Sequence, residues 1–189
     1  MAMKRLKINS WILLLVTGIL FITSAGFTQD SKEGRKERRE ERKAQLLANF
    51  SALDTVLNEK GFVLEADFLI NYYGLRYHVP STLNFIKVDA SKAILQTGSD
   101  VRFGTNGVGG VTAEGTIGSW KLEKNPKNLT YSLHFTVTTQ IGSYDVFMSV
   151  SADNHALATI TGLTPGRLTY DGYLVALYNT RTFKGQNTI

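Results

Sequence analysis

Residues 128–151 constrain the fold more than any other stretch, because polar and apolar side chains alternate along them. Apolar residues occupy every second position from Leu129 to Val137, and Thr, Ser or His fills the positions between. This period of two is typical of a strand with one buried face. A glycine turn at Gly142 then leads into a second alternating stretch. A single hairpin is marginal in water, so we expect the flanking segments to extend and cover it.

Strand-like spacing continues over residues 60–178. Phe62, Leu64, Ala66, Phe68 and Ile70 share one parity, and further short strands are predicted at 83–89, 92–96, 101–104, 111–122, 156–161 and 167–177. A change of parity predicts a bulge near residues 118–119. About eight antiparallel strands in meander order close most economically as an up-and-down barrel, or curl as a strongly bent sheet. The predicted class is therefore all-β, with a helix before the barrel.

The first 25 residues have the three-part layout of a secretory signal peptide. Lys4, Arg5 and Lys7 precede an apolar run at 11–22, and small residues follow up to a cleavage position after Ala25. The alternative is an uncleaved anchor, although the run is shorter than the roughly 20 residues of a spanning helix. We therefore expect a periplasmic or otherwise exported protein.

Residues 30–59 predict a charged helix, from about position 32 to 59. Opposite charges recur at helical spacing in its first half, and Leu46, Phe50, Leu53 and Leu57 form an apolar stripe in its second half. The first half is expected to be a solvated arm, with contact to anionic lipid or an acidic envelope polymer as the alternative. Residues 179–189 are expected to be a frayed polar tail.

The net charge of +5 invites a nucleic-acid interpretation, but the distribution of charge argues against it. Outside the predicted signal peptide and residues 32–43, the chain carries 11 basic and 12 acidic residues. The predicted barrel is therefore not basic, and nucleic acid is not an expected partner. The absence of cysteine excludes a disulfide framework, a thiolate metal site and a lipid anchor on cysteine.

A glycine-rich loop contains Gly104, Gly107, Gly109 and Gly110. A phosphate site of the dinucleotide or P-loop kind needs a helix directly after the glycines. Here a strand pattern follows, so we predict a tight or mobile turn at the rim of the barrel and no bound cofactor.

Catalytic and metal sites are not indicated. His78, His134 and His155 do not have the spacing of metal ligands, and His134 lies on the polar parity of its strand, which predicts exposure. Ser119 lacks the outer glycine of a nucleophile elbow. We predict a protein that is not an enzyme, with no catalytic, cofactor or metal residues.

The densest aromatic cluster is the candidate ligand or partner patch. It comprises Phe68, Tyr72, Tyr73 and Tyr77. Such residues most often cap the end of a barrel core, and the alternative is a binding surface at its mouth.

The sequence resembles DUF4251, a family of small exported bacterial proteins of unknown function, over roughly residues 38–175. The likeness lies in Phe103, the glycine-rich loop, and the segments 131–137, 144–150, 158–160 and 167–174. The resemblance implies a lipocalin-like barrel in a Gram-negative envelope and gives no catalytic or ligand residues. This chain departs from the family in a more Thr- and Asn-rich glycine loop and a longer charged arm.

The predicted function is a non-enzymatic binding module that holds a small apolar or amphipathic ligand. The alternative is a structural or interaction protein that docks on an envelope partner through its basic helix or aromatic loop. Any membrane contact is expected to be peripheral.

Overall fold

A computed structural model describes residues 10–98, 110–140, 142–162 and 166–188, with side chains from Lys32 onward. The chain divides into two compact units, Met1–Gln45 and Leu46–Ile189. Residues 1–9 of the predicted signal peptide and the predicted strand at 101–104 lie outside the described residues. The described part of the chain holds no helix with both the length and the apolar character that crossing a bilayer requires.

The predicted N-terminal helix is present, and it begins earlier than the charge pattern indicated. Helix α1 spans Ser10–Asn58. It ends where Lys60 adopts a left-handed backbone conformation (φ 55°), and the next residue opens the first strand. A left-handed residue is a common helix terminator, because it turns the chain away from the helix axis.

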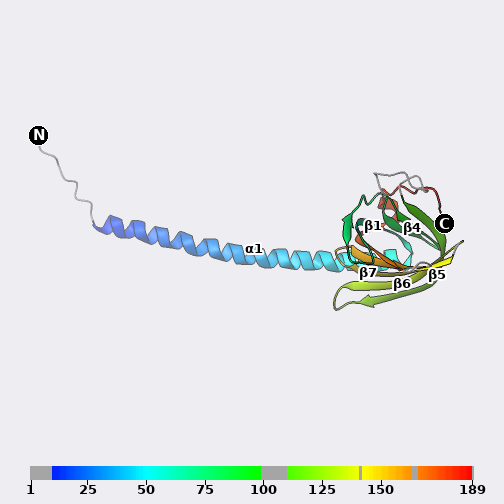
Figure 1. Cartoon of the computed structure of the whole chain (residues 1–189). Coiled ribbons are helices and arrows are strands. Elements are labelled where there is room, and N and C mark those ends of the chain that lie inside the picture. The colour runs from blue at the N-terminus through cyan, green and yellow to red at the C-terminus, as the bar shows by residue number, and fades with distance from the viewer. Residues whose placement is uncertain (1–9, 99–109, 141, 163–165, 189) are drawn as a thin grey trace, which may run out of the picture. The chain divides into compact units, whose positions relative to one another are not determined.

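In the part of the chain that the structure describes, nine strands follow and form one antiparallel sheet. The sheet wraps around on itself in Figure 1. The strands are β1 (Gly61–Ile70), β2 (Arg76–His78), β3 (Phe85–Asp89), β4 (Lys92–Thr97), β5 (Val111–Asn125), β6 (Thr130–Thr139), β7 (Gly142–Ser151), β8 (His155–Thr161) and β9 (Arg167–Ala176), before a short 3-10 helix η1 (Leu177–Asn179).

The sheet closes into a barrel because β1 pairs with β9. Short strand β2 pairs only with the second half of β1, so eight strands make the barrel wall. Consecutive strands are neighbours throughout the wall, which confirms the predicted up-and-down order. Closure pairs the two edges that an open sheet would expose.

Two bulges set which side chains point inward. The register of β5 against β6 shifts between Ile117 and Trp120, as the change of parity predicted, and both residues pack against the core. The register of β1 against β9 also shifts, between Ala66 and Phe68. The prediction that Phe68 shares the inward face of Ala66 is therefore wrong, and Leu69 packs against the core instead.

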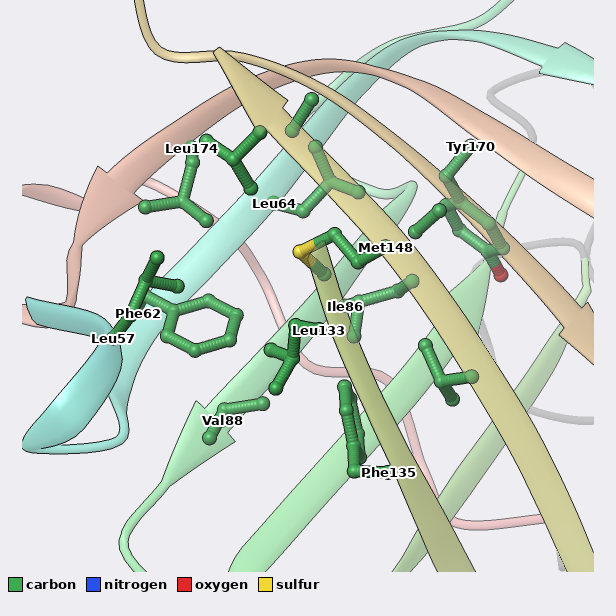
Figure 2. Packing of buried hydrophobic residues seen from close by; sticks show 14 of the residues in the cluster. Leu57, Phe62, Leu64, Ile86, Val88, Leu133, Phe135, Met148, Tyr170 and Leu174 are labelled. Atoms are coloured by element: carbon green, nitrogen blue, oxygen red, sulfur yellow. The ribbon is translucent and has the colours of Figure 1, made fainter. Parts of the chain in front are cut away.

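The barrel interior is filled with apolar side chains, and part of α1 contributes to it. Phe50, Leu53 and Leu57 of the helix are buried in the same cluster as the inward side chains of the strands. Figure 2 shows Leu57 and Phe62 among these residues. The buried Tyr131 hydroxyl lies 3.0 Å from the Phe50 carbonyl oxygen and 3.1 Å from Asp54 Oδ1, and its one proton is shared between these two acceptors. These contacts hold the last turns of the helix on the barrel.

The C-terminal tail is hydrogen-bonded to the barrel, so the prediction of a frayed end is wrong for residues 180–188. The Thr180 hydroxyl donates to Glu65 Oε1 at 2.6 Å, and the Gly185 amide donates to Gln96 Oε1 at 2.8 Å. The Thr188 amide donates to the Thr112 carbonyl oxygen at 2.9 Å. The tail was polar because it binds polar groups on the outer face of the sheet, and not because it is free in water.

Candidate functional site

The barrel has one end closed by the helix and one end that carries a pocket. Antiparallel order brings the ends of β4 and β8 together with the starts of β5, β7 and β9. The pocket lies at these strand ends and has a volume of about 330 Å³. Helix residues Phe50, Leu53 and Leu57 pack near the opposite ends of the strands, with Phe62 and Tyr131.

The pocket walls are mainly apolar. The described residues that line it are Leu95, Thr97, Val111, Ala113, Tyr144, Ile160, Gly162, Gly166, Arg167, Leu168 and Tyr170. Among the described residues this set contains no acid, histidine or cysteine, and its mainly apolar surface suits an apolar ligand. Pockets of this size hold small molecules.

Two tyrosines shape the pocket. Tyr170 is buried, and its hydroxyl donates to the Gln96 carbonyl oxygen at 3.2 Å. Burial raises the pKa of Tyr170 well above its ordinary value, so the phenol is neutral at any physiological pH. Tyr144 packs against Gly162, where a Cβ atom would lie 2.4 Å from ring atom Cδ1. Gly162 therefore makes room for the Tyr144 ring on the pocket wall.

The predicted aromatic patch lies elsewhere. Tyr72, Tyr73 and Tyr77 are 56%, 76% and 52% exposed, and the rings of Tyr72 and Tyr73 lie 4.1 Å apart. The Arg76 guanidinium lies 3.6 Å above the Phe68 ring. The structure thus brings the four aromatic residues to the β1–β2 hairpin, but none of them lines the pocket. The interpretation as a cap over the core does not fit the three exposed tyrosines.

Of the glycine-rich loop, Gly104, Gly107 and Gly109 lie outside the described residues. Gly110 is described, and a Cβ atom there would lie 2.1 Å from the Thr97 carbonyl oxygen. Gly110 is thus required by the close approach of the chain to the end of β4. The rest of the predicted turn lies outside the described residues.

A polar network on the outer face was not anticipated. Asp171 is only 7% exposed and accepts from the Arg76 guanidinium at 2.7 Å, while its other oxygen lies 2.8 Å from His155 Nε2. These contacts tie β2, β8 and β9 together. Alternation along β9 predicts only that Asp171 faces outward, and no pattern in the sequence predicts its pairing with Arg76 and His155.

The histidines show no metal-binding arrangement. Among the residues that the structure describes, no three of His, Cys, Asp or Glu lie close enough to hold a metal ion. His134 is half-buried and its ring stacks on Phe147, with centroids 4.1 Å apart and planes at 5°. Its Nε2 atom lies 3.5 Å from Asp145 Oδ1. Phe147 is exposed, so this pair lies on the outer surface of the barrel.

The fold and the pocket define a class of small closed β-barrels with an apolar cavity at one end. Residues 44–174 match the family described as a domain of unknown function, DUF4251. The chain belongs to the DUF4251 family. A crystal structure of a DUF4251 family protein from Bacteroides eggerthii DSM 20697 is similar, with a TM-score of 0.59 and 27% identity over 70% of this chain and 91% of that one. No curated protein matches the sequence.

Proposed function

We propose that this protein is an exported, non-enzymatic binding module that holds a small apolar or amphipathic ligand in the pocket of its barrel. The observation that carries the proposal is the 330 Å³ pocket, whose described walls are mainly aliphatic and aromatic. Removing such apolar walls from water is favourable in free energy, so the binding of an apolar ligand that displaces the water is favoured. Buried side chains fill the barrel interior past Tyr170, so the ligand is limited to the end of the barrel that carries the pocket.

Binding of the fluorescent apolar probe N-phenyl-1-naphthylamine tests the proposal. We expect saturable binding, and we expect Tyr144→Ala to weaken it about tenfold, because loss of an aromatic wall removes roughly 1–2 kcal/mol of contact. Tyr73→Ala is the matched control, since it removes the same group from the exposed hairpin. Thermal melting of both variants establishes that they are folded. An absence of binding, or an equal loss in both variants, contradicts the proposal.

Native mass spectrometry of the protein purified from its own cells examines the same proposal without a chosen probe. A bound species of a few hundred daltons that is extracted by organic solvent supports it. A mass equal to that of the chain alone, together with no probe binding, argues against it.

Export is part of this proposal and is supported by the basic start, the apolar run and the small residues of the first 25 positions. N-terminal sequencing of the purified protein checks it. We expect a new terminus at or shortly after position 26, and an intact Met1 would contradict cleavage.

A second candidate function is docking on an envelope partner through the aromatic hairpin. The observation that favours it is the exposure of Tyr72, Tyr73 and Tyr77, because monomeric surfaces rarely leave adjacent large aromatic rings in water. A pull-down from envelope extract compares the wild type with Tyr72→Ala/Tyr73→Ala and with a deletion of residues 32–43. Docking predicts that a specific partner is lost from at least one variant, and identical partners for all three proteins contradict it.

A further inference from the structure

Charges of opposite sign occupy opposite faces of α1 over residues 32–43. Successive residues of an α-helix are rotated by about 100°, so position in the sequence gives position around the axis. The bases fall within an arc of roughly 160° and the acids within a separate arc of about 100°. The basic face consists of Lys32, Arg35, Lys36, Arg38, Arg39, Arg42 and Lys43, and the acidic face consists of Glu33, Glu37, Glu40 and Glu41.

Pairs at helical spacing are more often alike than opposite in this arrangement, although three opposite pairs occur at i,i+3, namely Glu33/Lys36, Arg38/Glu41 and Glu40/Lys43. Pairs at i,i+4 stabilise a helix when their charges are opposite and destabilise it when they are alike. Lys36 and Glu40, 4.0 Å apart, are the one opposite pair at this spacing among residues 32–43. The six like-charged pairs are Lys32/Lys36, Glu33/Glu37, Arg35/Arg39, Glu37/Glu41, Arg38/Arg42 and Arg39/Lys43. A helix that only needed to be soluble would gain from mixed faces, so the segregation points to an external partner.

The composition of the segment limits what that partner can be. Gly34 is the only uncharged residue from 32 to 43, and all eleven charged residues are exposed. A coiled coil with a second copy needs an apolar seam, and insertion into a bilayer needs an apolar face. Residues 32–43 have neither an apolar seam nor an apolar face. The partner is therefore one that interacts with charged side chains alone. An extended anionic surface fits, because it can contact the whole basic face while the acidic face stays in water.

We propose that residues 32–43 adsorb through their basic face to the headgroup surface of a bilayer rich in anionic lipid, without insertion. Clusters of four to eight Lys and Arg on one face of a helix are attracted to anionic lipid, and the basic face has seven such residues. Cleavage near position 26, as proposed above, removes the apolar run at residues 11–22 and leaves the basic face close to the new N-terminus. The attraction to the bilayer therefore depends on charge alone. This surface is independent of the barrel pocket.

Co-sedimentation of the exported form of the chain, purified after cleavage, with vesicles tests this proposal. Neutral phosphatidylcholine vesicles are compared with vesicles that contain 30% phosphatidylglycerol, so that binding that does not depend on charge appears in both. We expect at least about tenfold tighter binding to the anionic vesicles at low salt, and a preference below about twofold in 0.5 M salt, because screening weakens exposed charge pairs.

The matched variant exchanges neighbouring charges and keeps composition and net charge. It carries Lys36→Glu, Glu37→Lys, Arg39→Glu and Glu40→Arg, which mixes the faces and makes most i,i+4 pairs opposite, so its helix should be at least as stable. We expect the preference for anionic vesicles to fall about fivefold or more. An equal preference in wild type and variant would show that net charge alone acts and would overturn the proposal.

Two further outcomes would also overturn it. One is self-association of the wild type, but not of the variant, in sedimentation without vesicles, which would make a second copy the occupant. The other is tighter binding to a soluble sulfated polysaccharide than to vesicles at equal anionic charge, which would make a polymer the partner.

Discussion

Gly172 lies where the barrel closes, and its lack of a side chain is a structural requirement. It pairs with Ala66 of β1, next to the bulge that separates Ala66 from Phe68. A Cβ atom at Gly172 would lie 2.0 Å from the Glu65 carbonyl oxygen and 2.7 Å from the Ala66 Cα atom. Both of these are backbone atoms and cannot rotate away. The close approach of β9 to β1 therefore depends on glycine at this position.

Gly172→Ala is expected to lower the free energy of unfolding by about 1–3 kcal/mol, since the added methyl group must displace backbone in the pairing that closes the barrel. Urea unfolding followed by circular dichroism measures this. Gly61→Ala is the control, because a Cβ atom there meets no heavy atom within 4 Å. If both variants lose the same stability, the close contact is not the cause.

Tyr131 links the helix to the barrel through its hydroxyl. Tyr131→Phe keeps the buried ring and removes the bonds to the Phe50 carbonyl and to Asp54, so we expect a loss of about 1 kcal/mol. Tyr173→Phe makes the same change on an exposed ring and is expected to change stability by less than about 0.5 kcal/mol. The midpoints of urea unfolding of the two variants measure these changes. A Tyr131→Phe variant as stable as the wild type would refute a stabilising role for these bonds.

Among the elements, the C-terminal tail acts as a strap on the outer face of the barrel. Gln96 is fully buried beneath it and donates to the Phe183 carbonyl oxygen at 2.8 Å. Glu114 accepts from Lys184, and from Asn187 at 2.8 Å. Truncation after Asn179 removes all of these bonds and is expected to lower stability by about 2–4 kcal/mol, while Arg181→Ala within an intact tail changes it little. Thermal melting compares the two, and an unchanged midpoint for the truncated chain would contradict the strap.

The strap should also respond to pH through Glu114. The hydrogen bond from Lys184, and then that from Asn187, lowers the pKa of Glu114 below its ordinary value. A group with a lowered pKa in the folded state stabilises the fold above its unfolded pKa, near 4.3, and this contribution disappears as pH falls through the folded pKa. We expect Glu114→Gln to be less stable than wild type by about 0.5 kcal/mol at pH 7 and equal to it near pH 3. A difference that persists at pH 3 would exclude this titration as the cause.

The sequence predicted these elements to different degrees. The alternation of polar and apolar residues predicted β6 and β7 almost residue by residue, because each strand has one face in the core and one in water. It failed at the end of β1, where the bulge after Ala66 depends on the pairing with β9, more than a hundred residues away. It also failed for the tail, since Thr180 and Gly185 find their partners on β1 and β4. The residues that line the pocket could not be predicted, because the described walls come from five strands that only the closed barrel brings together.

At the scale of the whole molecule, helix α1 has one part in each of the two compact units, and the two parts differ in their side chains. Residues up to Gln45 form the first unit, which includes the charged faces of α1. Phe50, Leu53 and Leu57 belong to the second unit and to its core. The match to DUF4251 begins at residue 44 and so includes these three core residues. The smallest part of the chain with a complete core therefore starts before Phe50 and not at the first strand.

Two truncations test this division. A chain that begins at residue 45 keeps Phe50, Leu53 and Leu57 and is expected to melt in one cooperative transition within about 2 °C of the full chain. A chain that begins at residue 60 loses three buried side chains, each contributing about 1.5–3 kcal/mol. This loss is comparable with the whole stability of a small domain, about 5–15 kcal/mol, so the shorter chain is expected to be unfolded or to bind hydrophobic dyes as a loosened state. Circular dichroism and dye fluorescence distinguish the two. A native-like barrel without residues 46–58 would show that the strands alone close the core, and a large loss on removing only residues 1–44 would show that the first unit supports the second.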